Sequence, residues 1–432
     1  MGALRMGPFD AEGSWRPADM ASLPGVSDRR AAPVVAALGE TLAVLCEPGD
    51  LLAAPAAPHP AFTALLALAG FTAEHLIVPE LFGESPAAST PTPARWSEIR
   101  TAVAGLTLAP YAVLRSTAVL GEALGLAGTH PPYDTVVRVN SKSWSNEIVR
   151  RNGWAGAGEV AHDTTELRRL VTAHGSADVV VKDPYGVAGR GSLVVTSPRV
   201  LDSIVRHLDA QVAAGAYVEV IVQARYRRRL DFSTHWEINP DGSAEPGAVV
   251  QTDNRDFTYA GSRPATDELL RTLDETDHPE IAATVAGELS KDGYHGPVCI
   301  DGMVIEEGTV VPVLEVNART SMGMIGLALQ ARAASCGLQA VLRHLPVRVG
   351  TARAFERLAG ELERDNLAFD GKSPGALLVT AGTLVPPRGR LCLALFTERP
   401  SDEVVLLTAV ATAAGRAGIR IFGTETTGKA SA

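Results

Sequence analysis

The chain has 432 residues, of which 46% are apolar and 20% charged, and its formal net charge is −10. This length predicts two to four subdomains, and the composition is that of a globular protein rather than a disordered one. The negative charge argues against a protein whose main partner is nucleic acid or an anionic membrane.

The four cysteines lie far apart and form no CxxC pair. This pattern indicates buried thiols in a reducing compartment, and neither a zinc site nor a disulfide framework. The N-terminal residues carry acids and no apolar h-region, so they do not resemble a secretory signal. The longest apolar tract, residues 102–128, is interrupted by Pro110, Arg115 and Glu122, which excludes a membrane span there. We therefore expect a cytoplasmic protein.

Residues 1–30 are rich in Gly, Pro, Ala and charge, and we expect them to form a loose arm. From residue 31, short apolar segments alternate with helical patterns, which indicates a small parallel sheet covered by helices. No GxGxxG follows a strand, so a dinucleotide-binding domain is not supported. The expected elements are strands at Thr41–Cys46 and His75–Val78, helices at Pro60–Ala69, from Trp96 and at Val113–Leu126, a turn at residues 47–50, and a loop at residues 85–93.

The pattern changes at residue 136. A strand at Val136–Val139 is expected to lead into Lys142 and a helix that runs through Arg151. Two further strands, Glu159–Ala161 and Ala177–Lys182, are expected around a helix at Thr165–His174.

A glycine-rich loop, residues 183–192, follows the strand that ends at Lys182. Gly186, Gly189 and Gly191 allow a ligand to approach the backbone closely and let N–H groups surround an anion, and Lys182 adds a cation. A Walker A loop would need GxxxxGK[ST] before a helix, whereas this loop joins two strands. A kinase-type glycine flap is the closer analogy. An ordinary flexible hairpin is the alternative.

The next segment is predicted to contain a helix at Val200–Ala214 and strands at Tyr217–Ala224 and Leu230–Ile238. The charged segment Arg227–Arg229 forms either a solvated edge or a rim that attracts an anionic substrate. Residues 251–264, with Arg255 and Arg263, are expected to form a polar loop.

Residues 296–323 contain two expected buried strands, Val298–Ile305 and Thr309–Val316, joined by a polar turn at residues 306–308. Three oxygen ligands, Asp301, Glu315 and Asn317, lie within or directly after this apolar pair. Buried acids usually coordinate a cation or pair with a base. Ligands that are all oxygen suit Mg²⁺, whose coordination is often completed by substrate phosphates. A helix at Pro279–Asp292 is expected before this pair, and a long apolar helix at Ile325–Leu345 after it.

The last part, from about residue 350, is predicted to be a separate unit with a role in packing, substrate closure or oligomer contact. No catalytic cluster is visible in it. Its expected elements are strands at Ala376–Ala381 and Arg390–Leu395, a helix at Ser401–Ala417 and a strand at Ile419–Phe422.

Taken together, Lys142, the loop after Lys182, the strand Tyr217–Ala224 and the set Asp301…Glu315-x-Asn317 resemble the ATP-grasp superfamily in order and spacing, over residues 136–345. Within it, the segment DFSTHWEI with NPDG, together with the C-terminal unit, is most similar to the peptide ligase of pheganomycin biosynthesis. The implied fold is α/β and α+β: an ATP-grasp fold with an N-terminal Rossmann-like pre-ATP-grasp domain and a small C-terminal α+β domain. The expected domains are a loose arm at 1–30, the pre-ATP-grasp domain at 31–135, a lid subdomain at 136–225, a catalytic subdomain at 226–348 and the C-terminal domain at 349–432.

The resemblance implies an ATP-dependent carboxylate–amine ligase that forms an amide or peptide bond through an acyl phosphate, in peptide natural-product biosynthesis. Its implied cofactors are ATP and one or two Mg²⁺ ions. Its implied partners are a small-molecule carboxylate and an amino-acid or peptide amine, with no nucleic acid and no membrane, and a homodimer is left open. A phosphotransferase and a nucleotide-binding protein without turnover are the alternatives.

Residue roles follow from the same resemblance. Stabilising an acyl phosphate needs a donor near the developing charge, and Arg319 is the first candidate because it follows Asn317 closely, with Arg255 second. The other implied roles are phosphate contacts for Lys142 and Lys182, a flap formed by Gly186, Gly189, Gly191 and Ser192, adenine contacts near Gln223, ribose contacts near Asp231, and Mg²⁺ ligands at Asp301, Glu315 and Asn317.

Overall fold

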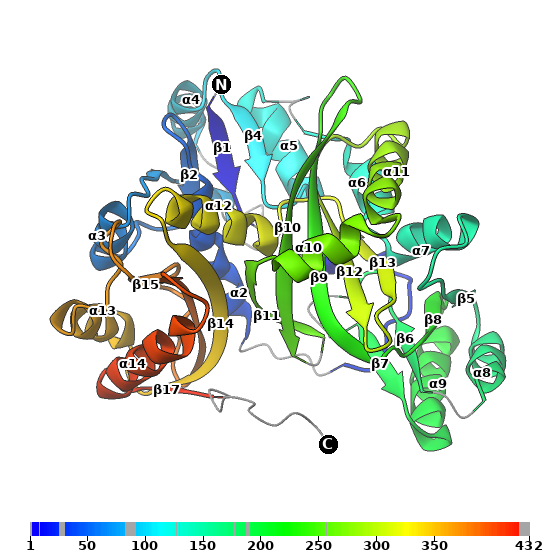
Figure 1. The fold of residues 1–432 in the computed structure, drawn as a ribbon. Helices are drawn as coiled ribbons and strands as arrows, with labels where there is room; N and C mark the ends of the chain where they lie inside the picture. The colour runs from blue at the N-terminus through cyan, green and yellow to red at the C-terminus, as the bar shows by residue number, and fades with distance from the viewer. Residues whose placement is uncertain are drawn as a thin grey trace.

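The structure is a computed structural model, and it describes residues 2–7, 9–25, 31–82, 92–126, 128, 130–175, 178–186, 191–255 and 257–422. Three sheets organise these residues. In Figure 1 the C-terminal strands and helices lie at the left, the central hairpins in the middle, and the helices α8 and α9 at the right.

The first sheet has four parallel strands in the order β3-β2-β1-β4. Its central strand β1 lies at residues 3–6, so the expectation of a loose arm at 1–30 is wrong for this part. The expected strand at residues 41–46 is also wrong, because these apolar residues continue a helix as a 3-10 helix. The elements are β1 Ala3–Met6, α1 Ala11–Trp15, α2 Ala32–Ala37, η2 Leu38–Leu45, β2 Leu51–Ala54, α3 Pro60–Leu68, β3 Glu74–Ile77, η3 Pro79–Leu81, α4 Pro93–Ala102, β4 Thr107–Pro110 and α5 Arg115–Leu124. Most of the loop expected at residues 85–93 lies outside the described residues.

The second sheet has four antiparallel strands in the order β5-β8-β6-β7 and packs against α8 and α9. The chain enters it through two helices, α6 and α7. The strand expected at residues 136–139 is therefore wrong: this β-branched stretch is helical, because Pro132 caps α6 and its apolar face packs in the core. The elements are α6 Tyr133–Val139, α7 Lys142–Arg151, β5 Glu159–Ala161, α8 Thr164–Ala173, β6 Val179–Lys182, β7 Ser192–Val195, α9 Pro198–Ala213 and β8 Val220–Ala224.

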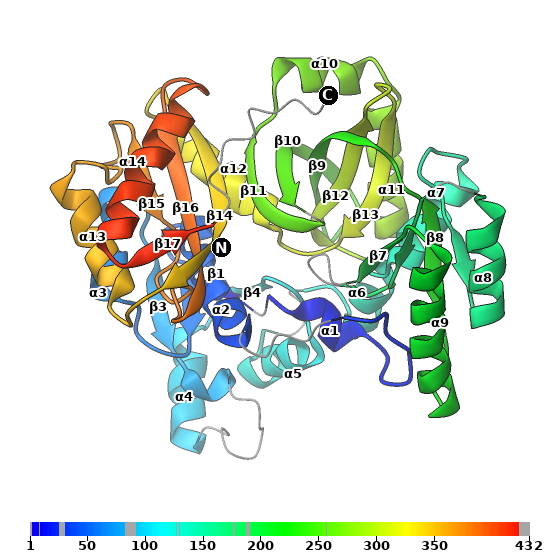
Figure 2. The same ribbon diagram turned by 90° about the horizontal axis from the view of Figure 1, so that it is seen from below.

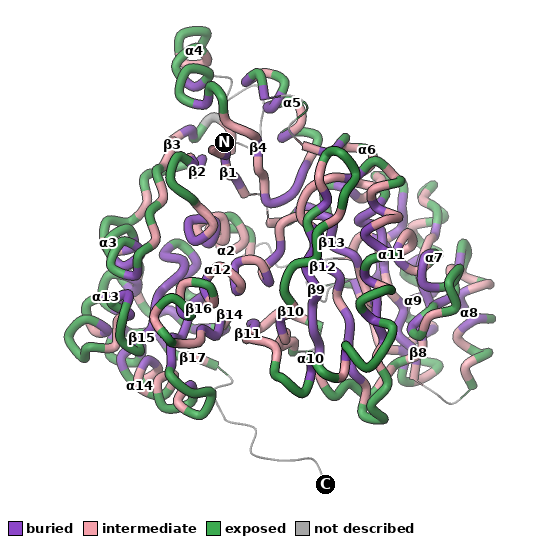
Figure 3. The backbone as a smooth tube through the Cα atoms, turned by 45° about the horizontal axis from the view of Figure 1, so that its top comes forward, coloured by how far each residue is buried: buried purple, intermediate pink, exposed green. Residues whose placement is uncertain are grey.

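The third sheet has nine strands in the order β13-β12-β9-β10-β11-β14-β16-β15, with β17 beside β14. Its first part contains the expected hairpin β12–β13 and a second hairpin, β10–β11, at residues that were expected to form a polar loop. Figure 3 shows buried backbone along β9, β12 and β13, and Figure 2 shows the strands β9 to β13 of this sheet between its C-terminal strands and α9. The elements are β9 Arg228–Ile238, β10 Ala244–Arg255, β11 Thr258–Pro264, α10 Asp267–Asp274, α11 His278–Lys291, β12 Gly296–Ile305, β13 Val310–Asn317 and α12 Met322–Ala334.

The C-terminal part continues this same sheet, so the expected separate unit is joined to the strands β9 to β13 through backbone pairing. The long helix expected at residues 325–345 is wrong, because α12 ends at Ala334 and Gly337, with φ +71, turns the chain into β14. Strand β14 then pairs with β11 at Gly261 and Ser262. The elements are β14 Gln339–Val349, α13 Ala354–Arg364, β15 Gly375–Leu378, β16 Arg388–Thr397, α14 Asp402–Arg416 and β17 Ile419–Ile421.

Ion pairs reinforce this junction between β11 and β14. Arg343 on β14 bonds to Asp253 on β10 and to Glu403 at the start of α14. Arg263 on β11 donates to the same two acids, at 3.0 Å and 3.2 Å. Two arginines thus share two acids across the join.

Candidate functional site

The hairpin β12–β13 brings the three expected oxygen ligands together. Asp301 pairs with Glu315 in the strand register, and Cys299 pairs with Asn317, so these side chains share one face of the sheet. Asn317 Nδ2 donates to Asp301 Oδ2 at 2.8 Å. Ser233, from the neighbouring strand β9, donates to Asp301 Oδ1 at 2.5 Å. The sheet therefore fixes two carboxylates and one amide side by side.

Electrostatics at this hairpin favour a bound cation. Burial and the charge of the neighbouring Glu315 carboxylate raise the pKa of Asp301 to about 6, although the hydrogen bond from Ser233 opposes the shift. No group of three His, Cys, Asp or Glu side chains suited to a metal is found among the described residues. The expected set of oxygen ligands contains only two such side chains, Asp301 and Glu315, and its third member is the amide of Asn317, so that result does not exclude a metal there. Two adjacent acids and an amide oxygen are the donor types that Mg²⁺ accepts.

Lys142 links this hairpin to the glycine-rich loop. It begins α7, where Ser141 caps the helix. Its Nζ atom donates to Glu315 Oε1 at 2.7 Å and to the carbonyl oxygen of Gly186 at 2.9 Å. The ammonium group is buried, so this contact joins the expected metal side and the expected phosphate side of the site.

Lys182 lies at the end of β6, close enough to Glu315 and Lys142 to feel both charges. Burial and the charge of Lys142 lower the pKa of Lys182 to about 8, although the charge of Glu315 opposes the shift. Two lysines and one glutamate therefore occupy one poorly solvated region.

The glycine-rich loop starts as a tight turn. The backbone N–H of Asp183 donates to the carbonyl oxygen of Gly191 at 2.7 Å. A Cβ atom added at Gly186 would lie 2.2 Å from the Cα of Gly191, so only glycine fits where the two ends of the loop cross. Ser192 pairs with Lys182 in the strand register. Gly189 lies outside the described residues.

The two expected nucleoside contacts already have protein partners. Gln223 on β8 is buried, and its Nε2 atom donates to the carbonyl oxygen of Gly156. Asp231 on β9 accepts from Arg228 at 2.8 Å and from Asn254 at 2.7 Å, and burial raises its pKa. Their roles toward adenine and ribose stay predictions.

Of the two candidate arginines, Arg319 lies in the site. Its Nη2 atom donates to Asn317 Oδ1 at 2.9 Å and to Glu12 Oε1 at 2.5 Å, and its Nη1 atom donates to the Tyr111 hydroxyl at 3.0 Å. Its guanidinium carbon lies 5.2 Å from the centre of the Tyr111 ring. Arg255 is exposed at the end of β10. Arg319 is thus the candidate that touches the oxygen set.

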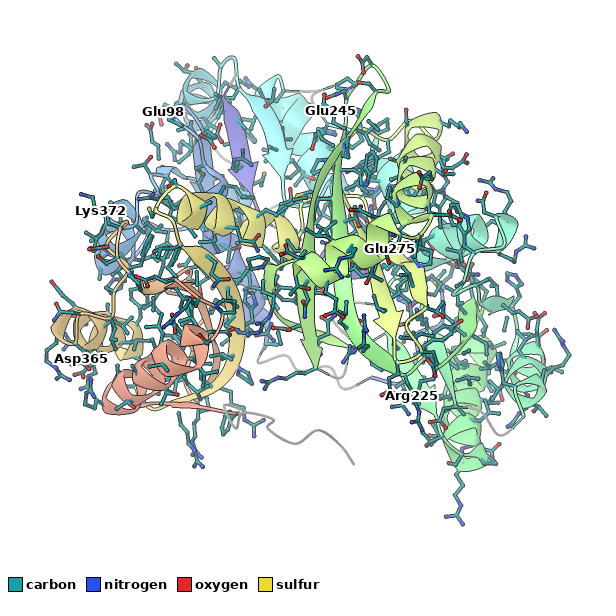
Figure 4. The ribbon with its side chains drawn as sticks, in the orientation of Figure 1. Glu98, Arg225, Glu245, Glu275, Asp365 and Lys372 are labelled. Carbon is teal, nitrogen blue, oxygen red and sulfur yellow. The ribbon has the colours of Figure 1, made fainter. Side chains whose placement is uncertain are left out.

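The sequence analysis missed Glu12, Tyr111 and Ser233, which all contact the predicted residues. Glu12 is buried, and although burial alone would raise its pKa, the charge of Arg319 holds the pKa below its usual range. The pair is separated by 307 positions in the chain, so no local pattern could indicate it. The six charged side chains labelled in Figure 4 are exposed by contrast: Glu98, Arg225, Glu245, Glu275, Asp365 and Lys372.

Comparisons with known proteins identify the fold. No family model matches the chain. A curated protein from Niallia circulans, [butirosin acyl-carrier protein]–L-glutamate ligase, is 26% identical over 196 residues, which cover 42% of this chain and 43% of that protein. The chain thus matches less than half the length of that relative.

Solved structures resemble this chain over most of its length. An N5-carboxyaminoimidazole ribonucleotide synthetase bound to ADP superimposes with a TM-score of 0.54 at 12% identity, covering 87% of this chain and 93% of that one. An L-amino acid ligase from Bacillus licheniformis gives 0.52 at 14% identity, covering 98% of each chain. The biotin carboxylase domain of the 2-oxoglutarate carboxylase from Hydrogenobacter thermophilus gives 0.55 at 12% identity, covering 94% of this chain and 90% of that one. These likenesses confirm the ATP-grasp fold that the motifs predicted.

Proposed function

We propose that this chain is an ATP-dependent carboxylate–amine ligase, which forms an amide or peptide bond through an acyl phosphate and releases ADP and phosphate. The observation that carries the proposal is the position of Glu315. Its carboxylate lies 2.7 Å from Lys142 and beside Asp301, with Lys182 close enough to interact. A metal-bound triphosphate needs cations on one side and oxygen ligands for the metal on the other, and the two lysines and the hairpin side chains provide this arrangement.

The side chains divide the work of phosphoryl transfer, which depends on positioning and on neutralising oxygen charge. Lys142 and Lys182 would bind phosphate oxygens, and the loop of Gly186, Gly189, Gly191 and Ser192 would close over them. Asp301, Glu315 and Asn317 would hold one or two Mg²⁺ ions, which would neutralise phosphate oxygens further. Gln223 and Asp231 are proposed to lie near the adenine and the ribose.

Arg319 is proposed to stabilise the acyl phosphate and the tetrahedral state that follows amine attack. Its contact with Asn317 places it beside the oxygen set, and its buried guanidinium acts where water screens charge weakly. Lys182 completes the catalytic set, and Arg255 remains the second candidate.

The comparisons support this proposal in coarse form. The relative from Niallia circulans is named as a ligase, and one of the structures with this fold is an L-amino acid ligase. We propose a small-molecule carboxylate and an amino-acid or peptide amine as substrates, in peptide natural-product biosynthesis. We also propose a cytoplasmic location, and a homodimer stays open. No described helix has the length and apolar character needed to cross a membrane.

The test is ADP release from MgATP in the presence of amino acids and peptides, singly and in pairs. A ligase releases ADP only when both a carboxylate and an amine are present, and it transfers ¹⁸O from the labelled carboxylate to phosphate. ADP release with no amine, accompanied by a stable phosphorylated product, would identify a phosphotransferase. Nucleotide binding without any turnover would identify a binding protein.

A further inference from the structure

The N-terminal segment, residues 9–25, ties the two halves of the molecule together. Ala11 and Trp15 are buried in the large core, and Trp15 Nε1 donates to the carbonyl oxygen of Val113 at 2.9 Å. Further along, Ala21 and Leu23 are buried in the separate core of the second sheet. One short segment therefore belongs to both cores.

Two charged side chains of this segment, Glu12 and Arg16, contact residues of the proposed nucleotide site. Glu12 is the only charged hydrogen-bond acceptor of Arg319 among the described residues, since the others are an amide, a phenol and a backbone carbonyl. Arg16 pairs with the buried carboxylate of Asp183, the first residue of the glycine-rich loop. Asp183 in turn accepts from the backbone N–H of Tyr185 at 2.9 Å, inside that loop.

The spacing of the two residues explains how one turn reaches both places. Glu12 lies in α1, and Arg16 is the residue that directly follows this helix. The two residues are four positions apart, and the backbone N–H of Arg16 donates to the carbonyl oxygen of Glu12, which closes the turn between them. The first reaches the loop after β13, and the second reaches the loop after β6. These loops follow strands of different sheets, and both adjoin the proposed nucleotide site, because Arg319 contacts Asn317 and Gly186 accepts from Lys142.

Stability alone does not account for these contacts. Removing two charges from water costs free energy that a buried ion pair often fails to recover. The segment is already held by Trp15 and by backbone hydrogen bonds of 2.8 Å that join Ala21 and Asp19 to Tyr217.

We propose that Glu12 and Arg16 are positioning residues of the active site: Glu12 orients Arg319 toward the transferring phosphoryl group, and Arg16 orients residues 183–186, at the start of the glycine-rich loop, through Asp183. This inference rests on the proposed function, because it assigns Arg319 and the loop to ATP. It places the N-terminal turn within the machinery of the site.

The experiment compares Glu12→Gln and Arg16→Gln with a matched control, Asp50→Asn. Asp50 is also a buried acid of the N-terminal part and holds Arg5 at 2.7 Å, away from the site. Calorimetry would measure the affinity for MgADP alone and for MgADP with aluminium fluoride, a planar mimic of the transferring phosphoryl group. Neither probe requires the acyl or amine substrate to be known.

The affinity of Glu12→Gln for MgADP is expected to lie within twofold of the parent protein's affinity. Adding aluminium fluoride raises the affinity of the parent protein, and this increase is expected to be at least tenfold smaller in Glu12→Gln. Arg16→Gln is expected to weaken MgADP binding itself at least fivefold, and Asp50→Asn to leave both affinities within twofold. Glu12→Asp and Arg16→Lys, which keep the charge, should give intermediate losses and decide the matter if a glutamine variant fails to fold.

The role of Glu12 would be overturned if aluminium fluoride increased the MgADP affinity of the Glu12 variants as much as it increases that of Asp50→Asn. A parent protein that gains no affinity from aluminium fluoride would overturn it as well, because Arg319 would then have no phosphoryl group to stabilise. Unchanged MgADP affinity in the Arg16 variants would overturn the role of Arg16. A parent protein that binds no MgADP would overturn the proposed function itself. The other outcomes concern only the roles of Glu12 and Arg16, so the two kinds of failure can be told apart.

Discussion

Lys142 and Glu315 are separated by 173 positions in the chain, yet Lys142 Nζ lies 2.7 Å from Glu315 Oε1. This contact joins α7 to β13 and places a cation against one of the two paired carboxylates. The same ammonium group bonds to Gly186, so it also marks the entrance to the glycine-rich loop.

Replacing Glu315 by Gln removes the charge that Lys142 contacts and one of the two paired acids. We expect ATP-dependent ADP release to fall by at least a hundredfold, on the order of 3 kcal/mol of transition-state stabilisation. The control is Glu306→Gln, in the turn of the same hairpin, where the acid is exposed and lies 3.8 Å from Arg227. Equal turnover in the two variants would contradict the assignment of the site.

Replacing Lys142 by Met keeps much of the apolar stem and removes the ammonium group. We expect affinity for MgATP, measured by calorimetry, to fall at least tenfold, because a cation that faces the phosphates is lost. Lys291→Met is the control, since Lys291 is exposed and its one ion pair among the described residues is with Glu288, at 2.9 Å. Nucleotide affinity that survives in Lys142→Met would place the phosphates elsewhere.

Alanine at Gly186 or Gly191 places a Cβ atom only 2.2 Å or 2.1 Å, respectively, from the Cα atom of the other glycine, which is a severe clash. Either substitution should force the ends of the loop apart and weaken MgATP binding several-fold. Gly360→Ala provides the contrast. Gly360 lies within α13 with no atom near its added Cβ, so this change should raise stability by up to about 1 kcal/mol. Wild-type nucleotide affinity in Gly186→Ala would argue against a close crossing of the loop ends.

His344 provides a prediction about acid stability. Burial lowers its pKa to about 3, and its Nε2 atom has no hydrogen-bond partner among the described residues. In the unfolded chain the His344 imidazole takes up a proton near pH 6.5, whereas in the folded chain it stays neutral until the pH approaches 3. His344 therefore does not change the unfolding free energy above pH 6.5, and it lowers the unfolding free energy as the pH falls from 6.5 toward 3.

Between pH 7 and pH 5 the loss attributable to His344 should be on the order of 2 kcal/mol. Urea denaturation at the two pH values measures it, and His344→Phe should remove about that much of the pH dependence. His207→Gln, at an exposed position, should leave the pH dependence as it is. A parent protein and a His344→Phe variant with the same pH dependence would show that the imidazole is protonated in the folded state.

The parts of the fold that were predicted correctly have strong local signals. The hairpin β12–β13 has two β-branched runs and a polar turn, and the loop after Lys182 has glycines between two apolar strands. In both, the chemistry of neighbouring residues determines the structure. The same holds for α7, where Ser141 supplies the helix cap.

The errors occur where distant contacts override the local pattern. Residues 251–264 look polar because their strands are partly exposed, but they pair with β9 and β14. Residues 325–345 are mostly apolar, and Gly337, with φ +71, marks the point where the helix gives way to a strand. Glu12 has no local signal, because its importance comes entirely from Arg319.

The pairing of β11 with β14 also has a consequence for shortened forms of this protein. The join consists of Gly261 and Ser262 against Leu342 and Arg343, and it is reinforced by shared ion pairs. A chain that ended before residue 339 would leave β11 as an open edge with unpaired N–H and C=O groups, and such edges recruit strands from other molecules. The C-terminal strands therefore act as a permanent cover that protects the sheet carrying the site from self-association.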